Sequence, residues 1–246
     1  MPQYLWIIRH GDRFDYEIGA FKWSNLGQRL HDPPLSRLGI QQAMETSSEI
    51  KKYELANNMK VSRIITSPFL RCIETSNPIA NKLELSLLVD HSLFELGQTQ
   101  EYMPPLSERV IYFPRIDTTY ESVFIPSKDE EFPMAPIIRY GNSISQIINK
   151  FPGENCIVVT HAAGVVSIIS RLLKKPLRNV KPASACCLFL LSRDDESSEW
   201  KLEDDYNGSV SHLSEIGNTK PWPRYDEEIS HGCSKFVNAG DVTPWL

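Results

Sequence analysis

The feature that most constrains the fold is an apolar run near the start of the chain that ends in a charged turn. Residues 4–8 read Tyr-Leu-Trp-Ile-Ile, and the turn that follows reads Arg9-His10-Gly11-Asp12-Arg13. A run of β-forming residues that stops at a polar turn predicts a buried strand of a parallel sheet. Open α/β sheets bind their ligands just beyond the carboxyl ends of their strands. We therefore expect an α/β fold with a site at this first turn.

The turn itself combines groups that suit phosphate. The guanidinium groups of Arg9 and Arg13 match phosphate oxygens in pairs, and Gly11 lets backbone N–H groups approach an anion closely. The imidazole of His10 is better placed to attack a phosphorus atom than to bind a metal, because the turn holds little else that binds metal. The tripeptide Arg-His-Gly also arises by chance, so a strand-end histidine in a satisfied turn is the alternative at this point.

The overall composition limits the classes of function that fit. The 246 residues suffice for one large α/β domain with a sizeable core. The formal net charge is −5, from 26 Lys and Arg against 31 Asp and Glu, so we expect no nucleic-acid partner. No signal peptide is recognisable, and the longest clean apolar run, residues 185–191, is too short to span a bilayer. We therefore expect no membrane partner.

The cysteines indicate a reducing compartment. The five cysteines are an odd number without the paired spacing of a metal site. Cys156, Cys186 and Cys187 lie in apolar runs, where reduced core thiols are typical. The sequence therefore predicts a cytoplasmic protein. Its oligomeric state stays open, a homodimer included.

Strand and helix signals alternate along the chain, which predicts one domain over residues 1–246, with a mainly parallel sheet and helices on both faces. The expected further strands lie at residues 61–66, 85–89, 156–160, 185–192 and 200–202. The expected helices run from about Leu35 to about Ala56 with Ser36 as cap, from Pro68 onward with Ser67 as cap, from about Ile137 to Lys150, and from Val165 to Lys174. Residues 207–209, Asn-Gly-Ser, suggest a hairpin turn.

Three segments interrupt this alternation. Residues 14–34 form an expected irregular segment, whose aromatic residues either wall a substrate pocket or pack the segment onto the body. Residues 97–136 are rich in proline, which excludes long helices, and we expect a covering insertion over the strand ends. The C-terminal segment, rich in Trp, Pro and Gly, is expected to wrap the body.

Further polar residues follow the other expected strands. Arg71 falls in the first turn of a helix, His161 directly follows residues 156–160, and Glu95 lies between Phe94 and Leu96. A carboxylate in such apolar surroundings is a candidate for a raised pKa. Each residue also has an ordinary interpretation, as a solvated arginine, a structural histidine or an exposed glutamate. Their joint placement beyond strand ends indicates a single site.

Four motifs in a fixed order carry a resemblance to a known family. They are Arg9-His10-Gly11-x-Arg13, Leu35-Ser36-x-x-Gly39-x-x-Gln42-Ala43, Ser67-Pro68-x-x-Arg71-x-x-x-Thr75 and Val158-Val159-Thr160-His161-Ala162. Together they resemble the histidine phosphatase superfamily, in its phosphoglycerate-mutase-like branch, over residues 1 to about 192. The resemblance implies a three-layer α/β/α fold with a mainly parallel sheet.

Two further segments narrow the resemblance. Phe94-Glu95 and Asp117-Thr118-Thr119-Tyr120, followed by Ile125-Pro126, are similar to the phosphatase domain of the Sts/TULA proteins and to the insect ecdysteroid-phosphate phosphatase. The chain leaves no room for the SH3 and ubiquitin-binding modules of Sts/TULA, so the resemblance does not extend to their ubiquitin binding. Residues 14–34 look shorter than the corresponding segment of those proteins. Cofactor-dependent mutases of the family carry Ser or Glu in place of Arg13, followed by a Trp-Asn pair, which disfavours mutase activity here.

The resemblance implies a role for each site residue. His10 would attack phosphorus and form a phosphohistidine, with its other ring nitrogen held by a nearby backbone acceptor. Arg9, Arg13, Arg71 and His161 would bind the non-bridging oxygens of a phosphate monoester. Glu95 would act as general acid and then as general base. No metal and no cofactor are expected, because the arginines take the role of an ion and no Asp, Glu or His grouping has the spacing of metal ligands.

The sequence thus predicts a phosphomonoesterase, and two other classes stay open. A phosphotransferase or mutase would pass the phosphate to a second substrate instead of water. A binding module would keep the fold without turnover, although the complete set of site residues disfavours it. Aromatic residues near the entrance favour an aryl phosphate, a steroid-like phosphate or phosphotyrosine over a sugar phosphate.

Overall fold

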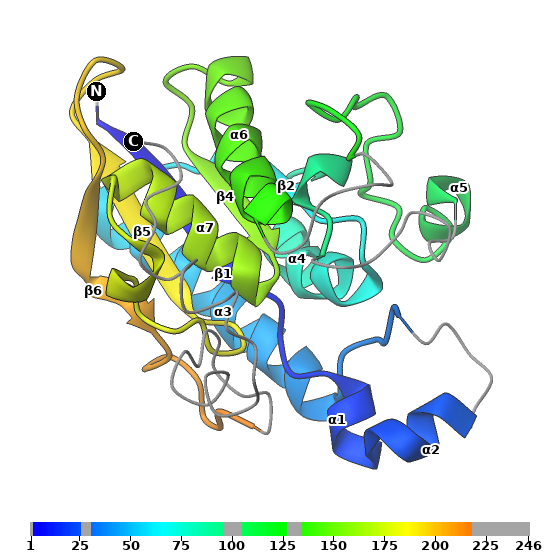
Figure 1. The fold of residues 1–246 in the computed structure, drawn as a ribbon. Helices are drawn as coiled ribbons and strands as arrows, with labels where there is room; N and C mark the ends of the chain where they lie inside the picture. The colour runs from blue at the N-terminus through cyan, green and yellow to red at the C-terminus, as the bar shows by residue number, and fades with distance from the viewer. Residues whose placement is uncertain (1, 26–30, 96–104, 127–133, 218–246) are drawn as a thin grey trace.

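A six-stranded sheet forms the middle of the molecule in the computed structural model, which describes residues 2–25, 31–95, 105–126 and 134–217 (Figure 1). The strands are β1 (Gln3–Arg9), β2 (Arg63–Thr66), β3 (Leu87–Val89), β4 (Cys156–Thr160), β5 (Leu188–Arg193) and β6 (Lys201–Ser209). Their order across the sheet is β3-β2-β4-β1-β5-β6. The strands β1 to β4 are parallel, and β5 and β6 are antiparallel to their neighbours. The expected α/β fold with a mainly parallel sheet is confirmed.

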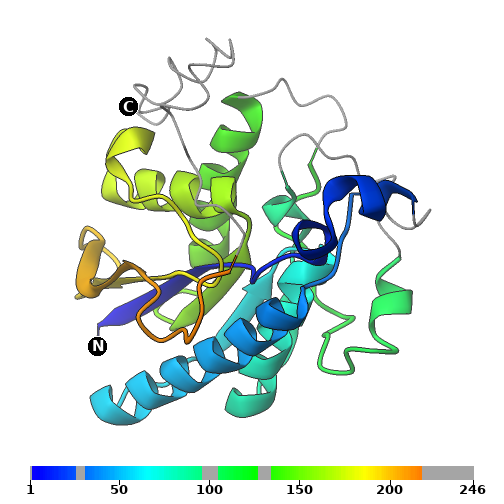
Figure 2. The same cartoon turned by 90° about the horizontal axis from the view of Figure 1, so that it is seen from below.

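Helices cover both faces of the sheet, as the view along its edge shows (Figure 2). The helices α3 (Arg37–Asn57) and α4 (Leu70–Leu83) lie on one face, and α6 (Met134–Lys150) and α7 (Ala162–Leu173) lie on the other. Shorter helices connect these elements: α1 (Phe14–Ile18), α2 (Ala20–Asn25), α5 (Leu106–Arg109), and the 3₁₀ turns η1 (His91–Leu93) and η3 (Leu177–Asn179). No helix in the described ranges is long and apolar enough to cross a membrane.

The first strand is apolar throughout because both of its faces are buried. Successive side chains of a strand point to opposite faces. Leu5 and Ile7 therefore belong to the core under α6 and α7, whereas Trp6 and Ile8 belong to the core under α3 and α4. All four side chains are almost fully buried. A strand in the middle of a parallel sheet reads as a continuous apolar run for this reason.

The register of the parallel strands brings their carboxyl ends to one level. Arg9 of β1 lies opposite Thr160 of β4, and Val159 of β4 lies opposite Thr66 of β2. The residue after each strand continues the hydrogen bonding of the sheet. The N–H of His10 donates to the oxygen of Thr160 at 3.0 Å, and the N–H of Ser67 donates to the oxygen of Val159 at 2.9 Å. The first residues beyond β1, β2 and β4 thus meet at one edge of the sheet, as the site requires.

Helix α4 begins two residues later than the sequence suggests. It starts at Leu70 with Phe69 as its N-cap, so Pro68 is not the first helical residue and Ser67 is not the cap. The hydroxyl of Ser67 instead lies 2.8 Å from Nε2 of His161. Asp32 supplies the cap from a distant segment, since its Oδ1 accepts the N–H of Leu70 at 2.7 Å.

Two other expected segments differ from the structure. Residues 14–25 contain α1 and α2 and are not irregular, and Trp23 is buried with its ring edge-to-face on Phe14. Residues 26–30 lie outside the described residues. The strand expected at 200–202 continues to Ser209, so residues 207–209 lie in β6 and not in a hairpin turn. A register irregularity at Phe189 accommodates Gly208, whose positive φ of 70° suits glycine.

The described part of the proline-rich segment lies against the edge of the sheet at β3. Ile116 forms an isolated parallel bridge with Leu87, and Leu87 exchanges backbone hydrogen bonds with Arg115 and Asp117. The remainder of this segment, at 97–104 and 127–133, lies outside the described residues, as does the C-terminal segment from residue 218. Four cysteines of the described chain, Cys72, Cys156, Cys186 and Cys187, are free and buried, and the last three are those expected in the core.

Candidate active site

His10 lies at the end of β1 with its ring orientation fixed by the backbone. The side chain is buried, and Nδ1 is 2.8 Å from the carbonyl oxygen of Gly11. A carbonyl oxygen only accepts, so Nδ1 carries the proton and Nε2 carries the lone pair. The expected backbone acceptor is therefore present. This tautomer presents a neutral nucleophilic nitrogen on the side of the ring away from Gly11.

The turn that holds His10 is packed against the start of α3. A Cβ on Gly11 would lie 2.8 Å from the oxygen of Gly39, and a Cβ on Gly39 would lie 2.2 Å from the oxygen of Asp12. Asp12 is itself fastened to α3, because its Oδ2 accepts the hydroxyl of Ser36 at 2.7 Å and its N–H donates to Gln42 at 2.9 Å. The motif residues Ser36, Gly39 and Gln42 therefore have the spacing that lets the first turns of α3 contact and support the His10 turn.

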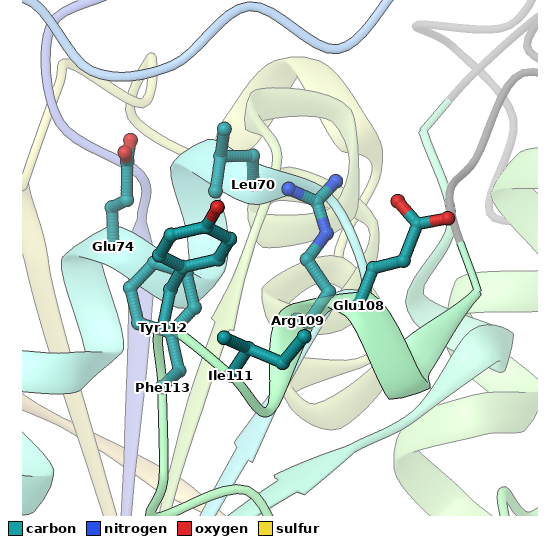
Figure 3. Close-up of a pocket in the computed structure, with 7 residues that line it drawn as sticks. All are labelled: Leu70, Glu74, Glu108, Arg109, Ile111, Tyr112 and Phe113. Atoms are coloured by element: carbon teal, nitrogen blue, oxygen red, sulfur yellow. The ribbon is translucent and has the colours of Figure 1, made fainter.

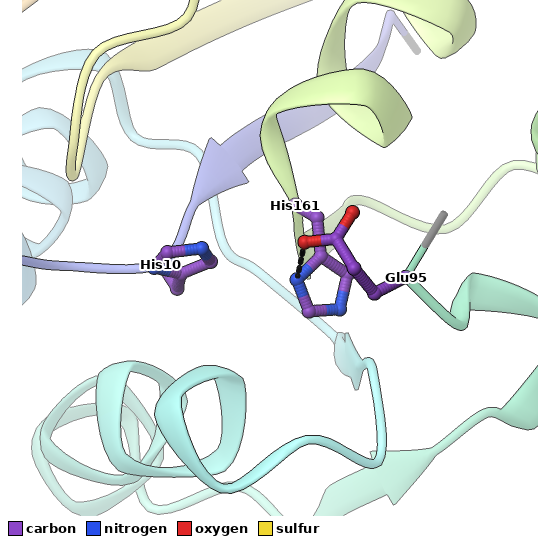
Figure 4. A group of neighbouring side chains, drawn as sticks. All are labelled: His10, Glu95 and His161. Atoms are coloured by element: carbon purple, nitrogen blue, oxygen red, sulfur yellow. Dashed lines mark ion pairs between the residues drawn. The ribbon is translucent and has the colours of Figure 1, made fainter. Parts of the chain in front are cut away.

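His161, Glu95 and Arg71 converge beside His10 from three other elements. Figure 4 shows the imidazole of His161 and the carboxylate of Glu95 in contact, with His10 across from them. Nδ1 of His161 is 3.0 Å from Oε2 of Glu95, and Nη2 of Arg71 is 3.3 Å from the same oxygen. The rings of His10 and His161 have centroids 5.5 Å apart. The structure thus brings these four residues together in one cluster, although the sequence places them up to 151 positions apart.

Arg9 and Arg13 take different positions at this edge of the sheet. Arg9 is buried, and its Nη1 donates to the carbonyl oxygen of Ala183 at 2.7 Å. Arg13 forms a two-pronged ion pair with Asp15, at 3.0 and 2.7 Å, and its guanidinium lies over the ring of Tyr16. The charges of both arginines contribute to the lowered pKa of His10.

The sequence did not identify Ser67 as part of this cluster. Its hydroxyl donates to Nε2 of His161 when Nδ1 of His161 donates to Glu95, and this fixes one tautomer of the second imidazole. The Ser-Pro pair after a strand resembles a helix cap, and that local interpretation hid the long-range contact. The sequence signal that could have identified Ser67 is its place in the motif Ser67-Pro68-x-x-Arg71.

The electrostatics of the site keep the two histidines neutral and the glutamate ionised. Burial, followed by the charges of Arg71 and Arg9, lowers the pKa of His10 well below 6.5. Burial also lowers the pKa of His161, to about 4, against the opposing effect of Glu95. For Glu95, burial alone would raise the pKa, but His161 and Arg71 hold it well below 4.5. The expectation of a raised pKa for Glu95 is therefore wrong, because the interactions with His161 and Arg71 outweigh the effect of burial.

We expect the imidazole of His10 to stay neutral between about pH 6 and pH 8, since its pKa lies well below the ordinary value of about 6.5. NMR of the histidine ring carbons would follow each titration, with the His10→Ala variant used to assign the signal. The nucleophile would then be available over the whole of this pH range. A His10 signal with its midpoint at or above the ordinary pKa would contradict the arrangement of charges.

The cluster also contains groups that bind metals. One ligand atom each of His10, Glu95 and His161 lie within 4.8 Å of one another. The sequence places these residues in one site but predicts no grouping with the spacing of metal ligands, and these distances correct that prediction. Arg71 lies among these atoms, with Nη2 only 3.2 Å from Nδ1 of His161, and a buried guanidinium repels a divalent cation. The charge of the site therefore fits an anion better than a metal ion.

A separate pocket of about 430 Å³ lies on the neighbouring face of α4 (Figure 3). Its lining residues are Leu70, Glu74, Glu108, Arg109, Ile111, Tyr112 and Phe113. None of them belongs to the cluster around His10, although Leu70 directly precedes Arg71. Burial raises the pKa of Glu74 to about 7, against a hydrogen bond from the N–H of Leu35. This pocket flanks the site and does not contain it.

Comparison with known proteins assigns the family. Residues 5–205 match the Histidine phosphatase superfamily (branch 1). The chain belongs to this superfamily. The match includes every residue of the cluster, and the resemblance found in the four motifs is confirmed.

The chain covers very different shares of its relatives. The Transcription factor tau 55 kDa subunit of Saccharomyces cerevisiae is 27% identical over 180 residues, 69% of this chain and 40% of that protein. The human Ubiquitin-associated and SH3 domain-containing protein A is 25% identical over 205 residues, 74% of this chain and 30% of that protein. Phosphoglycerate mutase-like protein 4 of Arabidopsis thaliana is 28% identical over 221 residues, 86% of this chain and 87% of that protein. The chain thus corresponds to less than half of the first two proteins.

A solved structure supports the fold of this histidine phosphatase. The ecdysone phosphate phosphatase from Bombix mori, solved in complex with tungstate, superposes with a TM-score of 0.64. The superposition covers 93% of this chain and 99% of that one, at 19% sequence identity. At this sequence identity, the similarity shows a shared fold and nothing more.

Proposed function

We propose that this histidine phosphatase hydrolyses phosphate monoesters through a phosphohistidine on His10. The observation that carries the proposal is the tautomer of His10, whose Nδ1 proton is bound by Gly11 so that Nε2 has the lone pair. A neutral nitrogen next to several guanidiniums suits attack on a phosphorus atom, whose oxygens those cations would bind.

Arg71 supports the binding of an oxyanion. Its side chain is almost fully buried, and its Nε and Nη1 have no hydrogen-bond partner in the described part of the chain. Buried N–H groups are normally paired, so this deficit suits a ligand that brings acceptor oxygens. Arg9, Arg13 and His161 would add further donors and positive charge around the same oxygens.

The reaction would proceed in two displacements. Nε2 of His10 forms a bond to phosphorus as the bond from phosphorus to the leaving oxygen breaks, and that oxygen takes a proton from Glu95. Water then attacks the phosphohistidine, gives its proton to Glu95, and releases inorganic phosphate from His10. The arginines hold the non-bridging oxygens while their charge spreads in both transition states.

The low pKa of Glu95 in the free protein requires a source for the first proton. A monoester carries a second phosphate proton with a pKa of about 6. When the phosphate enters the cluster, its negative charge raises the pKa of the nearby carboxyl group. Glu95 would therefore take this proton from the bound monoester and pass it to the leaving oxygen.

The organic part of the substrate is proposed to be an aryl group, a steroid-like group or phosphotyrosine. Tyr16 over Arg13, and Phe14 against Trp23, place aromatic rings next to the His10 turn. The solved neighbour is named for ecdysone phosphate, a steroid ester. Turnover of purified protein on phosphotyrosine, steroid, sugar and nucleotide phosphates tests this choice, and a preference for sugar phosphates would contradict it.

Phosphate transfer to a second substrate is the alternative, because one relative is named as phosphoglycerate mutase-like. Arg13 argues against it, since mutases of the resembled family carry Ser or Glu there. Incubation of a monoester with an alcohol or phosphoglycerate acceptor distinguishes the two. Free phosphate equal to the released alcohol supports hydrolysis, and a phosphorylated acceptor supports transfer.

We expect turnover to be independent of metal ions, because the guanidiniums occupy the surroundings that a divalent cation would need. Activity should survive exhaustive chelation and should be inhibited by vanadate or tungstate, which mimic the transferred phosphoryl group. Loss of activity on chelation, with recovery on addition of one divalent ion, would show that His10, Glu95 and His161 act as metal ligands instead.

A further inference from the structure

Two buried arginines share one buried carboxylate beside the site. Asp32 is fully buried, and its Oδ1 lies 3.8 Å from Nη1 of Arg71. Its Oδ2 accepts a hydrogen bond from Nη2 of Arg109. Its Oδ1 also accepts the N–H of Leu70 at 2.7 Å, at the first turn of α4. Three segments that are distant in the sequence therefore meet at this carboxylate.

The geometry divides the guanidinium of Arg71 between two partners. Nη2 points to Glu95 and His161, at 3.3 and 3.2 Å, whereas Nη1 points to Asp32. These contacts restrict the plane of the guanidinium, and Nη1, which among the described residues forms only an ion pair with Asp32, keeps its N–H groups for phosphate oxygens. The side chain also lies over the ring of Phe69, with 4.5 Å between the guanidinium carbon and the ring centroid.

Arg109 binds the other carboxylate oxygen of Asp32. It comes from α5 in the proline-rich segment and is buried, although its neighbours Ile111 and Tyr112 are exposed. It lines the pocket together with Leu70 (Figure 3). A buried carboxylate is costly unless it is paired. Arg109 thus stabilises Asp32 in its charged form at the start of α4, where the helix dipole also favours an anion.

We propose that Asp32 is a positioning residue for Arg71 and that Arg109 holds Asp32 in place, so that α5 supports the phosphate-binding arginine. Neither residue touches the substrate in this arrangement. The inference deepens the proposed function, because it assigns part of the insertion a role at the same site. Neither residue is marked by the four family motifs.

The direct test is Asp32→Asn, which keeps an oxygen for the N–H of Leu70 but removes the charge. A small displacement of a positioning group costs up to about 10²-fold in rate. We expect kcat/KM to fall by about 10- to 10²-fold. We expect the dissociation constant for inorganic phosphate, measured by calorimetry, to rise by at least about 10-fold. Because calorimetry needs no turnover, the test remains valid even if the protein is not a phosphatase.

Glu54→Gln is the matched control. Glu54 is also buried, accepts the N–H of Val61 at 2.7 Å and pairs with Lys51 at 3.0 Å, but it lies in α3 away from the cluster. We expect this variant to lose thermal stability like Asp32→Asn and to keep its phosphate affinity and kcat/KM. Equal kinetic losses in both variants would show a general structural effect and overturn the proposal.

Variants of Arg109 test whether Arg109 holds Asp32 in place. They remain informative even if the Asp32→Asn protein does not fold. Arg109→Met should weaken phosphate binding in the same direction, whereas Arg109→Lys should retain most of it by keeping the charge. Unchanged phosphate affinity in a folded Arg109→Met protein would overturn the role of Arg109. Tighter phosphate binding in Asp32→Asn would show that Asp32 weakens the charge of Arg71 instead of positioning it.

Discussion

Replacing His10 with alanine is expected to lower kcat by at least about 10⁴-fold, as removal of a covalent nucleophile does in other enzymes. The reason is that His10 supplies the nitrogen on which the phosphoryl group is held. Brief quenching with labelled substrate should trap a phosphoenzyme in the natural protein that is labile in acid and stable in base. The variant should yield no such species.

His212→Ala is a suitable control for this experiment. His212 is half-buried and lies 3.0 Å from the hydroxyl of Thr46, in contact with α3 and not with the cluster. Its loss should leave kcat unchanged, and circular dichroism should show that both variants are folded. Comparable activity of His10→Ala and the natural protein would exclude the covalent mechanism.

Replacing Glu95 with glutamine is expected to have an effect that depends on the leaving group. General acid catalysis is worth about 10²- to 10⁴-fold, so kcat/KM for an alkyl or steroid phosphate should fall within that range. p-Nitrophenyl phosphate should lose far less, because its leaving group departs as a stable phenolate without a proton. The comparison uses kcat/KM, since kcat also reports hydrolysis of the phosphohistidine, where Glu95 would act as base for every substrate alike.

Glu74→Gln is the control for this comparison. Glu74 is a half-buried carboxyl group on α4 that accepts the N–H of Leu35 and lies in the flanking pocket, outside the cluster. Any change in kcat/KM that this variant causes should be equal for the two classes of ester, because Glu74 does not contact the leaving group. A loss in Glu95→Gln of equal size for alkyl and aryl esters would contradict the role as acid and would assign Glu95 to the orientation of His161 and Arg71.

Local signals in the sequence determined the elements of the fold. Residues 4–8 are apolar on both faces of a strand, and this pattern identifies a central strand without knowledge of its neighbours. Ser36 caps α3 by accepting the N–H of Gly39 at 3.0 Å, a contact within one turn of the chain. Because polar residues beyond parallel strands meet at one edge of the sheet, His10, Arg71 and His161 were also identified from the sequence.

The tertiary structure alone decided how these groups interact. The hydroxyl of Ser67 was available both to a local helix cap and to His161, 94 residues away, and the packing of β2 beside β4 selected the second. The pKa of Glu95 follows from its burial, its hydrogen bond with His161 and the charge of Arg71 together, so Phe94 and Leu96 did not predict its direction. Asp32 and Arg109, 77 residues apart, carry no motif that links them. Sequence patterns report the conformation of neighbours in the chain, whereas the charge, tautomer and orientation of a buried group depend on partners that only the folded chain brings within reach.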